Sequence, residues 1–284
     1  MQKVKLTLFV LILSAVVLDA QSTKKLKNAP EMVLVKGGTY TIGCTSEQRD
    51  CDGDESPTVE VTVKDFHIGK YEVTQALWEE VTGKNPSKFK GESHPVESIS
   101  WYEAVEFCNK LSEMSGLTPA YKIDKSTVDP NNHNTDDKSK WTVEFDKDAN
   151  GFRLPLESEW EFAARGGVKG ADSQTLYSGS DDIGEVAWYY ENSDQKSHKV
   201  GSKSANVLGL YDMSGNVWEW CWSWKDNYNT GNITKADGAV SGTGRVYRGG
   251  SWFSEPKYCR VSPRGSDNPE YRDTGIGLRL VRSK

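Results

Sequence analysis

The sequence lacks the short motifs that mark most zinc enzymes, hydrolases and nucleotide-binding proteins. No metal-binding spacing separates its four histidines, His67, His94, His133 and His198. No Ser/His/Asp arrangement is recognisable, and no Gly-Gly pair is followed by the Lys-Ser/Thr of a phosphate-binding loop. Basic residues do not dominate either, because the formal net charge is −6 at pH 7 and no basic stripe with interleaved aromatics occurs. Nucleic acid is therefore not an expected partner.

Long apolar runs are scarce, and the most apolar stretch lies near the N-terminus. Two lysines precede a mostly apolar segment at residues 6–18, and the small residue Ala20 follows it. This order is typical of a cleaved signal peptide, here residues 1–20. The segment is short for a membrane span, although an uncleaved anchor is the alternative. The sequence thus predicts an exported protein, in the periplasm, on the cell surface or secreted, with residues 21–31 as a polar linker.

Glycine and aromatic residues are abundant. The 26 glycines indicate many turns, and the 10 tryptophans and 12 tyrosines indicate a core rich in aromatic packing. Helical patterns are expected over residues 75–81, 101–115 and 155–165, and none after residue 170. Strands are expected at 32–43, 59–66, 141–145 and in the alternating tryptophans of 218–224. Early helices beside a loop-rich β part predict an α+β fold in a single domain.

Five cysteines in an exported chain predict disulfides with one thiol left over. Cys44 and Cys51 bracket a polar step of seven residues, where a local bridge is expected. Cys221 and Cys259 lie in two motif-like segments, which a second disulfide would join. Cys108 falls on the apolar face of a helical pattern, which favours a buried thiol. The pairing is an inference, because the sequence alone does not fix it.

An acidic stretch at residues 47–55 contains Asp50, Asp52 and Asp54. It resembles the start of a calcium-binding loop. However, Val61 stands where an EF-hand requires its terminal glutamate. We therefore expect a solvated acidic loop that holds no metal.

Two Gly- and Arg-rich segments, residues 245–252 and 276–280, frame the C-terminal part of the chain. Between them Tyr, Ser, Asp, Asn, Pro and Gly predominate. Tyr supplies a large contact area at low entropy cost, and Ser, Gly and Asn supply adaptable hydrogen bonds, as in an antibody paratope. A series of arginines is expected to stiffen this region through carbonyls and aspartates: Arg248, Arg260, Arg264, Arg272, Arg279 and Arg282. An ordinary surface loop between two strands is the alternative interpretation.

Five ordered motifs cover nearly all of residues 32–284. They are Met-Val-Leu-Val-Lys-Gly-Gly-Thr at 32–39, Gly-Lys-Tyr-Glu-Val-Thr at 69–74, Arg-Leu-Pro with Glu-Trp-Glu at 153–161, Gly-Leu-Tyr-Asp-Met-Ser-Gly-Asn-Val-Trp-Glu-Trp at 209–220, and Arg-Gly-Gly-Ser at 248–251. Together they resemble the sulfatase-modifying-factor family, whose founding activity is the formylglycine-generating enzyme. The resemblance implies a C-type lectin-like fold of the formylglycine-generating-enzyme type.

The enzymes of this family carry two cysteines, five positions apart, shortly after the Arg-Gly-Gly-Ser motif, and their thiolates hold copper. In an ungapped match Ser254 occupies the first position, and only Cys259 is a thiol. Serine is a poor ligand for Cu(I), so this segment cannot build a two-thiolate site. The chain is therefore expected not to be an enzyme. The alternative is a copper oxidase acting on sulfatase cysteines, which would need Cys221 as its second thiol.

Residues 245–284 also resemble the treponemal variable proteins, non-catalytic binders whose C-terminal segment is diversified by a retroelement. In that mechanism template adenines are randomised, so that Asn codons become codons for Tyr, Ser, Asp, Gly, Phe, Pro or Thr, among others. The residues within this set are Tyr247, Phe253, Ser254, Tyr258, Pro263, Gly265, Ser266, Asp267, Tyr271, Asp273, Thr274 and Gly275. The resemblance implies that they form an exposed ligand-binding surface.

Four further residues, Asp212, Gly215, Val217 and Glu219, match a structural calcium site of the family. Two carboxylates and two backbone carbonyls in a tight turn supply the hard oxygen ligands that calcium prefers. The alternative is a plain glycine turn with exposed carboxylates. The resemblance implies a stabilising ion and no catalytic cofactor.

The sequence as a whole predicts an exported, non-catalytic, monomeric ligand-binding protein. The Gly/Arg frame would pre-organise residues 247–275, so that little affinity is lost to ordering the loop. A protein or a surface glycan of another cell is the expected ligand. A structural envelope protein that uses the fold only for packing is a further alternative.

Overall fold

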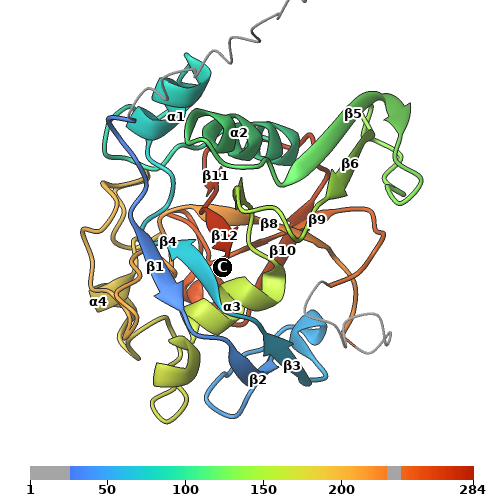
Figure 1. Ribbon diagram of the computed structural model, residues 1–284. Helices are drawn as coiled ribbons and strands as arrows, with labels where there is room; N and C mark the ends of the chain where they lie inside the picture. The colour runs from blue at the N-terminus through green and yellow to red at the C-terminus, as the bar shows by residue number, and fades with distance from the viewer. Residues whose placement is uncertain (1–25, 229–237) are drawn as a thin grey trace, which may run out of the picture.

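The computed structural model describes residues 26–228 and 238–284 (Figure 1). The predicted signal peptide, residues 1–20, and the first part of the predicted linker lie outside the described residues. Among the residues that are described, none of the helices has the length and apolarity needed to cross a membrane.

One four-stranded sheet joins the two ends of the domain. Its strands, in the order β1–β4–β12–β7, are β1 (Met32–Val35), β4 (Phe66–Gly69), β12 (Val281–Ser283) and β7 (Phe152–Arg153). All neighbouring strands are antiparallel. Because β12 lies between β4 and β7, the last strand of the chain completes a sheet that the first strand begins.

A second four-stranded sheet carries the C-terminal segment. Its strands, in the order β10–β9–β8–β11, are β10 (Arg264–Asp267), β9 (Arg245–Arg248), β8 (Trp218–Trp224) and β11 (Ile276–Gly277). Strands β8, β9 and β10 are antiparallel, whereas β11 runs parallel to β8. The segment predicted to bind a ligand therefore lies on and around one sheet.

Two hairpins complete the β structure: β2 (Gly38–Ile42) with β3 (Val59–Val63), and β5 (Tyr121–Val128) with β6 (Trp141–Phe145). The second hairpin projects from one side of the molecule (Figure 1). The predicted strand at 32–43 is in fact two strands, β1 and β2, in different sheets. Gly37 permits this change of direction, because a Cβ there would lie 2.3 Å from the carbonyl oxygen of Val63.

The three predicted helices are present as α1 (Gln75–Thr82), α2 (Trp101–Met114) and α3 (Glu157–Ala164). The Thr74 hydroxyl caps α1 by accepting a hydrogen bond from the Leu77 amide at 3.3 Å. Ser100 caps α2 by accepting from the Glu103 amide at 3.1 Å, and the Glu103 carboxylate accepts from the Ser100 amide at 2.8 Å. Side-chain caps of this kind explain why these two helices were predictable.

The prediction that no helix follows residue 170 was wrong. A single helical turn, α4 (Ile183–Val186), begins after Asp182, whose carboxylate accepts from the Gly184 amide at 2.8 Å. The remaining short turns are 3₁₀ helices: η1 (Gly53–Glu55), η2 (Gly167–Lys169) and η3 (Pro256–Cys259). Elements of one turn are too short to show a helical periodicity in the sequence.

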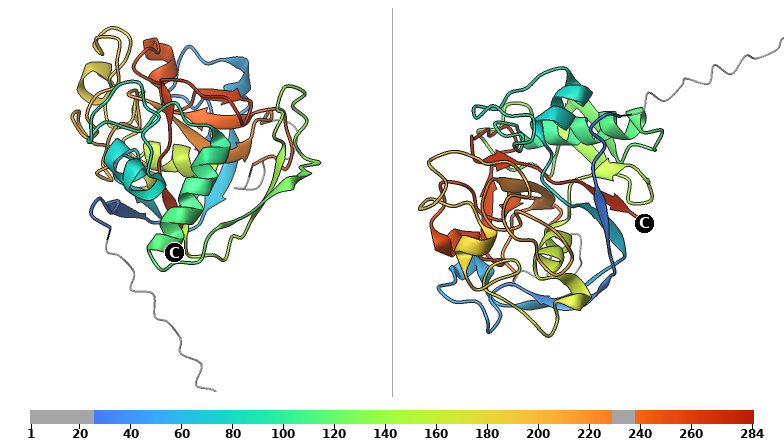
Figure 2. Two further views of the ribbon diagram at one scale, coloured as in Figure 1. Left: turned by 90° about the horizontal axis from the view of Figure 1, so that it is seen from above. Right: turned by 90° about the vertical axis from the view of Figure 1, so that its left-hand side faces the viewer.

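One core cluster lies between α2 and the second sheet, and another joins the first sheet to α3. Helix α2 runs along the top of the molecule in Figure 1 and faces the viewer in the left view of Figure 2. Trp101 of α2 is fully buried, and its indole donates to the Cys221 carbonyl of β8 at 2.9 Å. Its ring lies 5.3 Å from that of Trp222. Trp218, Trp220 and Trp224 are buried and Trp222 is partly buried, so most of the β8 tryptophans pack in the interior.

Candidate ligand-binding surface

Four buried arginines of the C-terminal segment are held by glutamates from other elements. The ion pairs are Arg248–Glu161, Arg260–Glu55, Arg264–Glu157 and Arg279–Glu219. In each pair both side chains are at most 6% exposed. Losing either partner would leave an unpaired charge in the interior, so these pairs fix the segment strongly. The predicted stiffening role of these four arginines is confirmed, with glutamates in place of the expected aspartates.

The same arginines also hold the backbone. The Arg248 guanidinium donates to the carbonyl oxygens of Ser262, at 2.5 Å, and Pro263. Arg260 donates to the Asp50 carbonyl at 3.1 Å. The bonds from Arg248 tie a turn of the segment to its strand β9, and the bond from Arg260 ties the segment to the acidic loop. The segment is therefore ordered without a ligand.

The acidic loop is not simply solvated, contrary to our prediction. Glu55 is fully buried, and its carboxylate accepts hydrogen bonds from Arg260 at 2.8 and 3.0 Å. The Cys44–Cys51 disulfide closes the loop just before it, as predicted. The burial of Glu55 was not visible in the local sequence, because its partner lies 205 positions further along the chain.

Replacing both Cys44 and Cys51 by serine is expected to lower the free energy of unfolding by about 2–3 kcal/mol, since the bridge closes a short loop. Urea denaturation of the double variant and the parent measures this. Addition of a reductant should lower the unfolding midpoint of the parent to that of the variant. An unchanged unfolding midpoint would show that the disulfide does not support the loop that carries Glu55.

The predicted Cys221–Cys259 disulfide is not present, because both cysteines are free, buried thiols. Cys221 packs in a cluster with Trp160 and Val246. Cys259 packs in a different cluster, around Leu176. The prediction was wrong because each sulfur fills a separate part of the core. Cys108 is a buried free thiol, as expected.

Nine of the residues predicted to bind a ligand are exposed or partly exposed, and we call these nine the display surface. They are Tyr247, Phe253, Tyr258, Gly265, Ser266, Asp267, Tyr271, Asp273 and Thr274. The two most exposed large side chains among them are Phe253, at 41%, and Tyr271, at 40%.

The other three predicted residues, Ser254, Pro263 and Gly275, are buried, so the expectation that they lie on the exposed surface was wrong. The Ser254 hydroxyl accepts a local backbone amide at 3.0 Å. The Pro263 carbonyl accepts from Arg248. A Cβ on Gly275 would lie 2.3 Å from the Phe253 ring, so this glycine makes room for that ring. Composition does not separate such turn residues from exposed ones of the same type.

Tyr247, on β9, forms the centre of the display surface. Its ring lies 5.1 Å from Trp218 and 5.4 Å from Trp220, in edge contacts with both. It also covers Gly265 on the neighbouring strand, where a Cβ would come within 1.8 Å of the ring. A side chain at position 265 would therefore have to displace Tyr247, so the two positions are sterically coupled.

An aromatic ridge borders the display surface. The rings of Phe253 and Trp252 lie 4.9 Å apart, and those of Trp252 and Phe89 lie 5.2 Å apart, both in edge-to-face contacts. The Trp252 indole donates to the Thr274 carbonyl at 3.0 Å. The ridge is thereby tied to the far end of the predicted segment.

Gly275 connects the ridge with Tyr247. Its carbonyl accepts from the Trp218 amide at 2.7 Å, and Trp218 contacts Tyr247. Its amide donates to the Asp273 carboxylate at 2.8 Å. The part of the display surface around Phe253 therefore lies next to the part around Tyr247.

The display surface is acidic at the end formed by Asp267, Tyr271 and Asp273. Burial and the neighbouring Asp273 raise the pKa of Asp267. Burial raises the pKa of Tyr247 to about 12, and Asp267, Tyr271 and Asp273 add to this shift. The sheet register brings these groups together, because Tyr247 is paired with Gly265 and Asp267 lies two residues further along β10, on the same face. The Tyr271 amide donates to the Asn268 carbonyl, next to Asp267, at 2.8 Å.

Sequence reasoning missed Tyr190, which is 64% exposed. Its amide donates to the Ser254 carbonyl at 3.0 Å, which places it beside the backbone that carries Phe253. Ser193 in the same loop donates to the Trp252 carbonyl at 2.6 Å. The loop has no regular secondary structure here, so no periodicity in the sequence could have indicated this contact.

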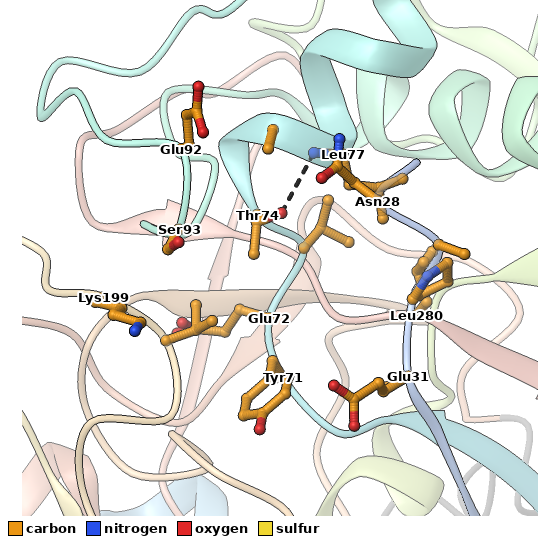
Figure 3. A pocket seen from close by; sticks show the side chains of 16 residues that line it. Asn28, Glu31, Tyr71, Glu72, Thr74, Leu77, Glu92, Ser93, Lys199 and Leu280 are labelled. Carbon is orange, nitrogen blue, oxygen red and sulfur yellow. Dashed lines mark hydrogen bonds between the residues drawn. The ribbon is translucent and has the colours of Figure 1, made fainter. Parts of the chain in front are cut away.

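Two hollows differ in their relation to the display surface. One, of about 360 Å³, lies between the segments around Glu31, Tyr71 and Lys199 (Figure 3). None of the residues that line it belongs to 245–275. The other, of about 700 Å³, is lined by residues 255–257 together with Arg49 and Tyr177. It borders the C-terminal segment on the side of the disulfide loop, although none of the nine display-surface residues lines it.

The residues expected to hold calcium form a buried turn, contrary to the alternative of exposed carboxylates. Asp212 is 3% exposed, and one of its oxygens accepts from the Gly201 amide at 2.7 Å while the other has no partner among the described residues. Gly215 is required by its neighbours, since a Cβ would lie 2.2 Å from the Trp188 carbonyl oxygen. The free Asp212 oxygen fits a hard cation.

Glu219 fits such an ion less well. Both of its oxygens accept hydrogen bonds from Arg279, at 2.6–3.0 Å, and one also accepts from the Trp160 indole at 2.6 Å. Within the described ranges no three His, Cys, Asp or Glu side chains are grouped as metal ligands. The expectation of a calcium ion stays a prediction.

The fold and this surface define a class of protein with a C-type lectin-like α+β scaffold that presents a rigid, aromatic C-terminal face. Residues 18–284 match the model of the sulfatase-modifying factor enzyme 1-like domain. The chain therefore belongs to the sulfatase-modifying-factor family.

Curated relatives carry different names. The chain is 41% identical over 298 residues to a protein of Paenibacillus barcinonensis named chaperone protein LppX, and the match covers 99% of each. It is 28% identical to the formylglycine-generating enzyme of Mus musculus, over 88% of this chain and 74% of that one. It is also 28% identical to the serine/threonine-protein kinase pkn1 of Chlamydia caviae, but the match spans only 38% of that protein.

Among solved structures, variable protein 1 of Treponema denticola is 37% identical, with a TM-score of 0.76 over 88% of this chain and 94% of that one. PvdO from Pseudomonas aeruginosa is 23% identical, with a TM-score of 0.70 over 91% and 96% of the two chains. The second similarity supports the fold alone. The placement in this family and fold that the sequence motifs predicted is confirmed.

Proposed function

We propose that this chain is an exported, non-catalytic protein that binds its ligand through the display surface and varies that surface between strains. The observation that carries the proposal is the contrast between the two layers of the C-terminal segment. Four buried Arg–Glu pairs fix its backbone, while the display surface consists of Tyr, Phe, Ser, Asp, Gly and Thr. Such a scaffold tolerates exchange of its exposed residues without loss of the fold.

The similarity to the Treponema variable protein supports a scaffold used for binding. The Cys44–Cys51 disulfide supports export, because disulfides persist in oxidising compartments. The proposal includes cleavage of residues 1–20 and diversification of the display surface by a retroelement. It also includes a monomeric state.

The copper-oxidase alternative conflicts with the thiols of this chain. The enzymes need two thiolates side by side, whereas Cys221 and Cys259 pack in separate core clusters. Burial raises the pKa of the Cys259 thiol to about 12 and also raises that of Cys221. Thiolates form only at a cost in such surroundings, so neither sulfur is poised to bind Cu(I).

One experiment separates the two functions. The purified chain is applied to arrays of extracellular proteins and of glycans, beside a variant with Phe253→Ser and Tyr271→Ser. We expect a ligand signal that the variant loses. In parallel, a sulfatase peptide containing cysteine is incubated with the copper-treated protein. Conversion of that cysteine to formylglycine would overturn the proposal.

A structural calcium ion at Asp212 forms part of the proposal. Calcium at about 100 times its Kd would add roughly 2.7 kcal/mol to the free energy of unfolding, and EGTA would remove this gain. Thermal unfolding with and without calcium measures it. Asp212→Asn should abolish most of the difference, whereas Asp172→Asn on the exposed surface should keep it. Equal melting temperatures of the parent in calcium and in EGTA would contradict the ion.

A chaperone role is the second candidate, favoured by the Paenibacillus relative, which matches along 99% of both chains and is named a chaperone protein. Binding of non-native proteins would then replace binding of a specific folded ligand. The chain should in that case suppress the aggregation of a heat-unfolded test protein such as citrate synthase. The display-surface account predicts no suppression at equimolar concentration.

A further inference from the structure

An aromatic face without a described partner occupies one side of the second sheet. Tyr247 lies on β9, and Tyr271, which is 40% exposed, belongs to the loop that follows β10. Phe253, 41% exposed, continues the face toward the ridge. Rings exposed on a rigid backbone are the usual anchors of a protein-binding surface, because they lose little conformational entropy on binding.

Two carboxylates on this face lack a cation. Neither Asp267 nor Asp273 forms an ion pair with any described residue. Asp267 is paired across the sheet with Arg245, but that guanidinium is stacked against tryptophans, 3.9 Å from the Trp101 ring centroid. The neighbouring Arg272 is engaged by Glu103 at 2.8 Å. The negative charge of the patch is therefore left for a ligand to neutralise.

We propose that the patch of Tyr247, Asp267, Tyr271 and Asp273 binds a lysine or arginine side chain of a protein ligand. The proposal rests on the proposed function and names the class of ligand. The patch combines two partly exposed tyrosines with two carboxylates, and both kinds of group attract a cation. An anionic glycan would be repelled, and a neutral glycan would leave the two charges unpaired.

The aromatic ridge determines what stands next to the basic residue. Phe253 packs on Gly275, whose amide is bonded to Asp273, so the ridge begins next to the acidic patch. An apolar side chain adjacent to the lysine or arginine of the ligand would rest on Phe253. Tyr190, outside the diversified segment, would contribute a constant contact at the edge. The ligand is thus a basic segment with a neighbouring apolar residue.

The test uses the full chain as bait for a phage-displayed library of random peptides. We expect the selected peptides to be enriched in Lys or Arg next to an apolar or aromatic residue. A synthetic peptide of this kind should bind the Asp267→Asn/Asp273→Asn variant about tenfold more weakly than the parent, because close charge pairs couple by about 1.5 kcal/mol or more. When norleucine replaces the basic residue of the peptide, the affinity of the parent should fall by about the same factor. The affinity of the Asp267/Asp273 variant should fall little.

A charge-matched control is Asp148→Asn/Asp172→Asn, which removes the same two charges from exposed positions elsewhere. This control should bind the peptide like the parent. Selected peptides without enrichment of Lys or Arg, or equal affinities for the parent and the Asp267/Asp273 variant, would overturn the inference.

The outcomes also separate this inference from the proposed function. Selection of non-basic peptides that no longer bind the Phe253→Ser/Tyr271→Ser variant would refute the basic ligand and support the binding surface. If the parent binds only glycans and the same variant does not bind them, the basic ligand is refuted and the binding surface is again supported. Peptides that bind this variant as well as the parent would refute both.

Discussion

Arg279→Met is expected to lower the free energy of unfolding by about 3–5 kcal/mol, the cost of breaking a buried ion pair from one side. Arg279 and Glu219 are both fully buried, with their closest atoms 2.6 Å apart. The guanidinium also donates to the carbonyls of Gly69 and Tyr211, at 2.8 and 2.7 Å. Methionine fills part of the space but leaves the Glu219 carboxylate without a counter-charge. Urea denaturation at neutral pH measures the change.

The matched control is Arg272→Met, which breaks an ion pair to Glu103 whose side chains are 50% and 39% exposed. Solvent screens this pair, so the expected change is below about 1 kcal/mol. Similar losses for the two variants would contradict the role assigned to the buried arginines.

Phe253→Ser combined with Tyr271→Ser is expected to reduce affinity for the ligand by about a thousandfold, since two aromatic anchors contribute about 2 kcal/mol each. The free energy of unfolding should fall by only about 1–2 kcal/mol per ring, because the rings are partly exposed, at 41% and 40%. Calorimetric titration with the ligand from the arrays measures the affinity, and thermal unfolding measures the stability.

The control variant is Val128→Ala with Val207→Ala, which trims two exposed apolar residues, at 69% and 54%, outside the display surface. Its affinity should equal that of the parent. A ligand that binds the Phe253/Tyr271 variant normally would show that binding takes place elsewhere on the chain.

Elements with local signals were predictable from the sequence. Thr74 and Ser100 mark the starts of α1 and α2, because a capping side chain and the amide that it accepts lie within one turn. Cys44 and Cys51 are also close neighbours in the chain, and their disulfide was predicted correctly. The family and its fold were predictable for a similar reason, since the motifs are read in order along the chain.

Features set by distant partners were not predictable. Glu55 has the sequence context of a solvated loop, but it is buried against Arg260 and Ser262, which lie far along the chain. Cys221 and Cys259 resemble a disulfide pair until their separate packing clusters are known. The exposed Tyr190 is placed beside Phe253 by a backbone hydrogen bond to Ser254. The residues around Tyr190 in the sequence do not indicate this bond. In a loop-rich fold, tertiary contacts rather than periodicity decide burial.

Twelve residues could be assigned to the C-terminal surface from their types, but their orientations could not. Ser254 and Ser266 are residues of the same type in the same segment. The first is nevertheless buried in a turn, and the second is partly exposed on β10. The structure therefore narrows the positions at which variation can alter binding without disturbing the frame.

Sequencing the 3′ end of the gene, with its flanking DNA, in many isolates tests the central claim most directly. The account predicts substitutions concentrated at the nine positions of the display surface, with Arg248, Arg260, Arg264 and Arg279 unchanged. It also predicts a nearby template copy whose mismatches fall only at adenines. A uniform 3′ end without such a template, or substitutions spread over the buried arginines, would contradict it.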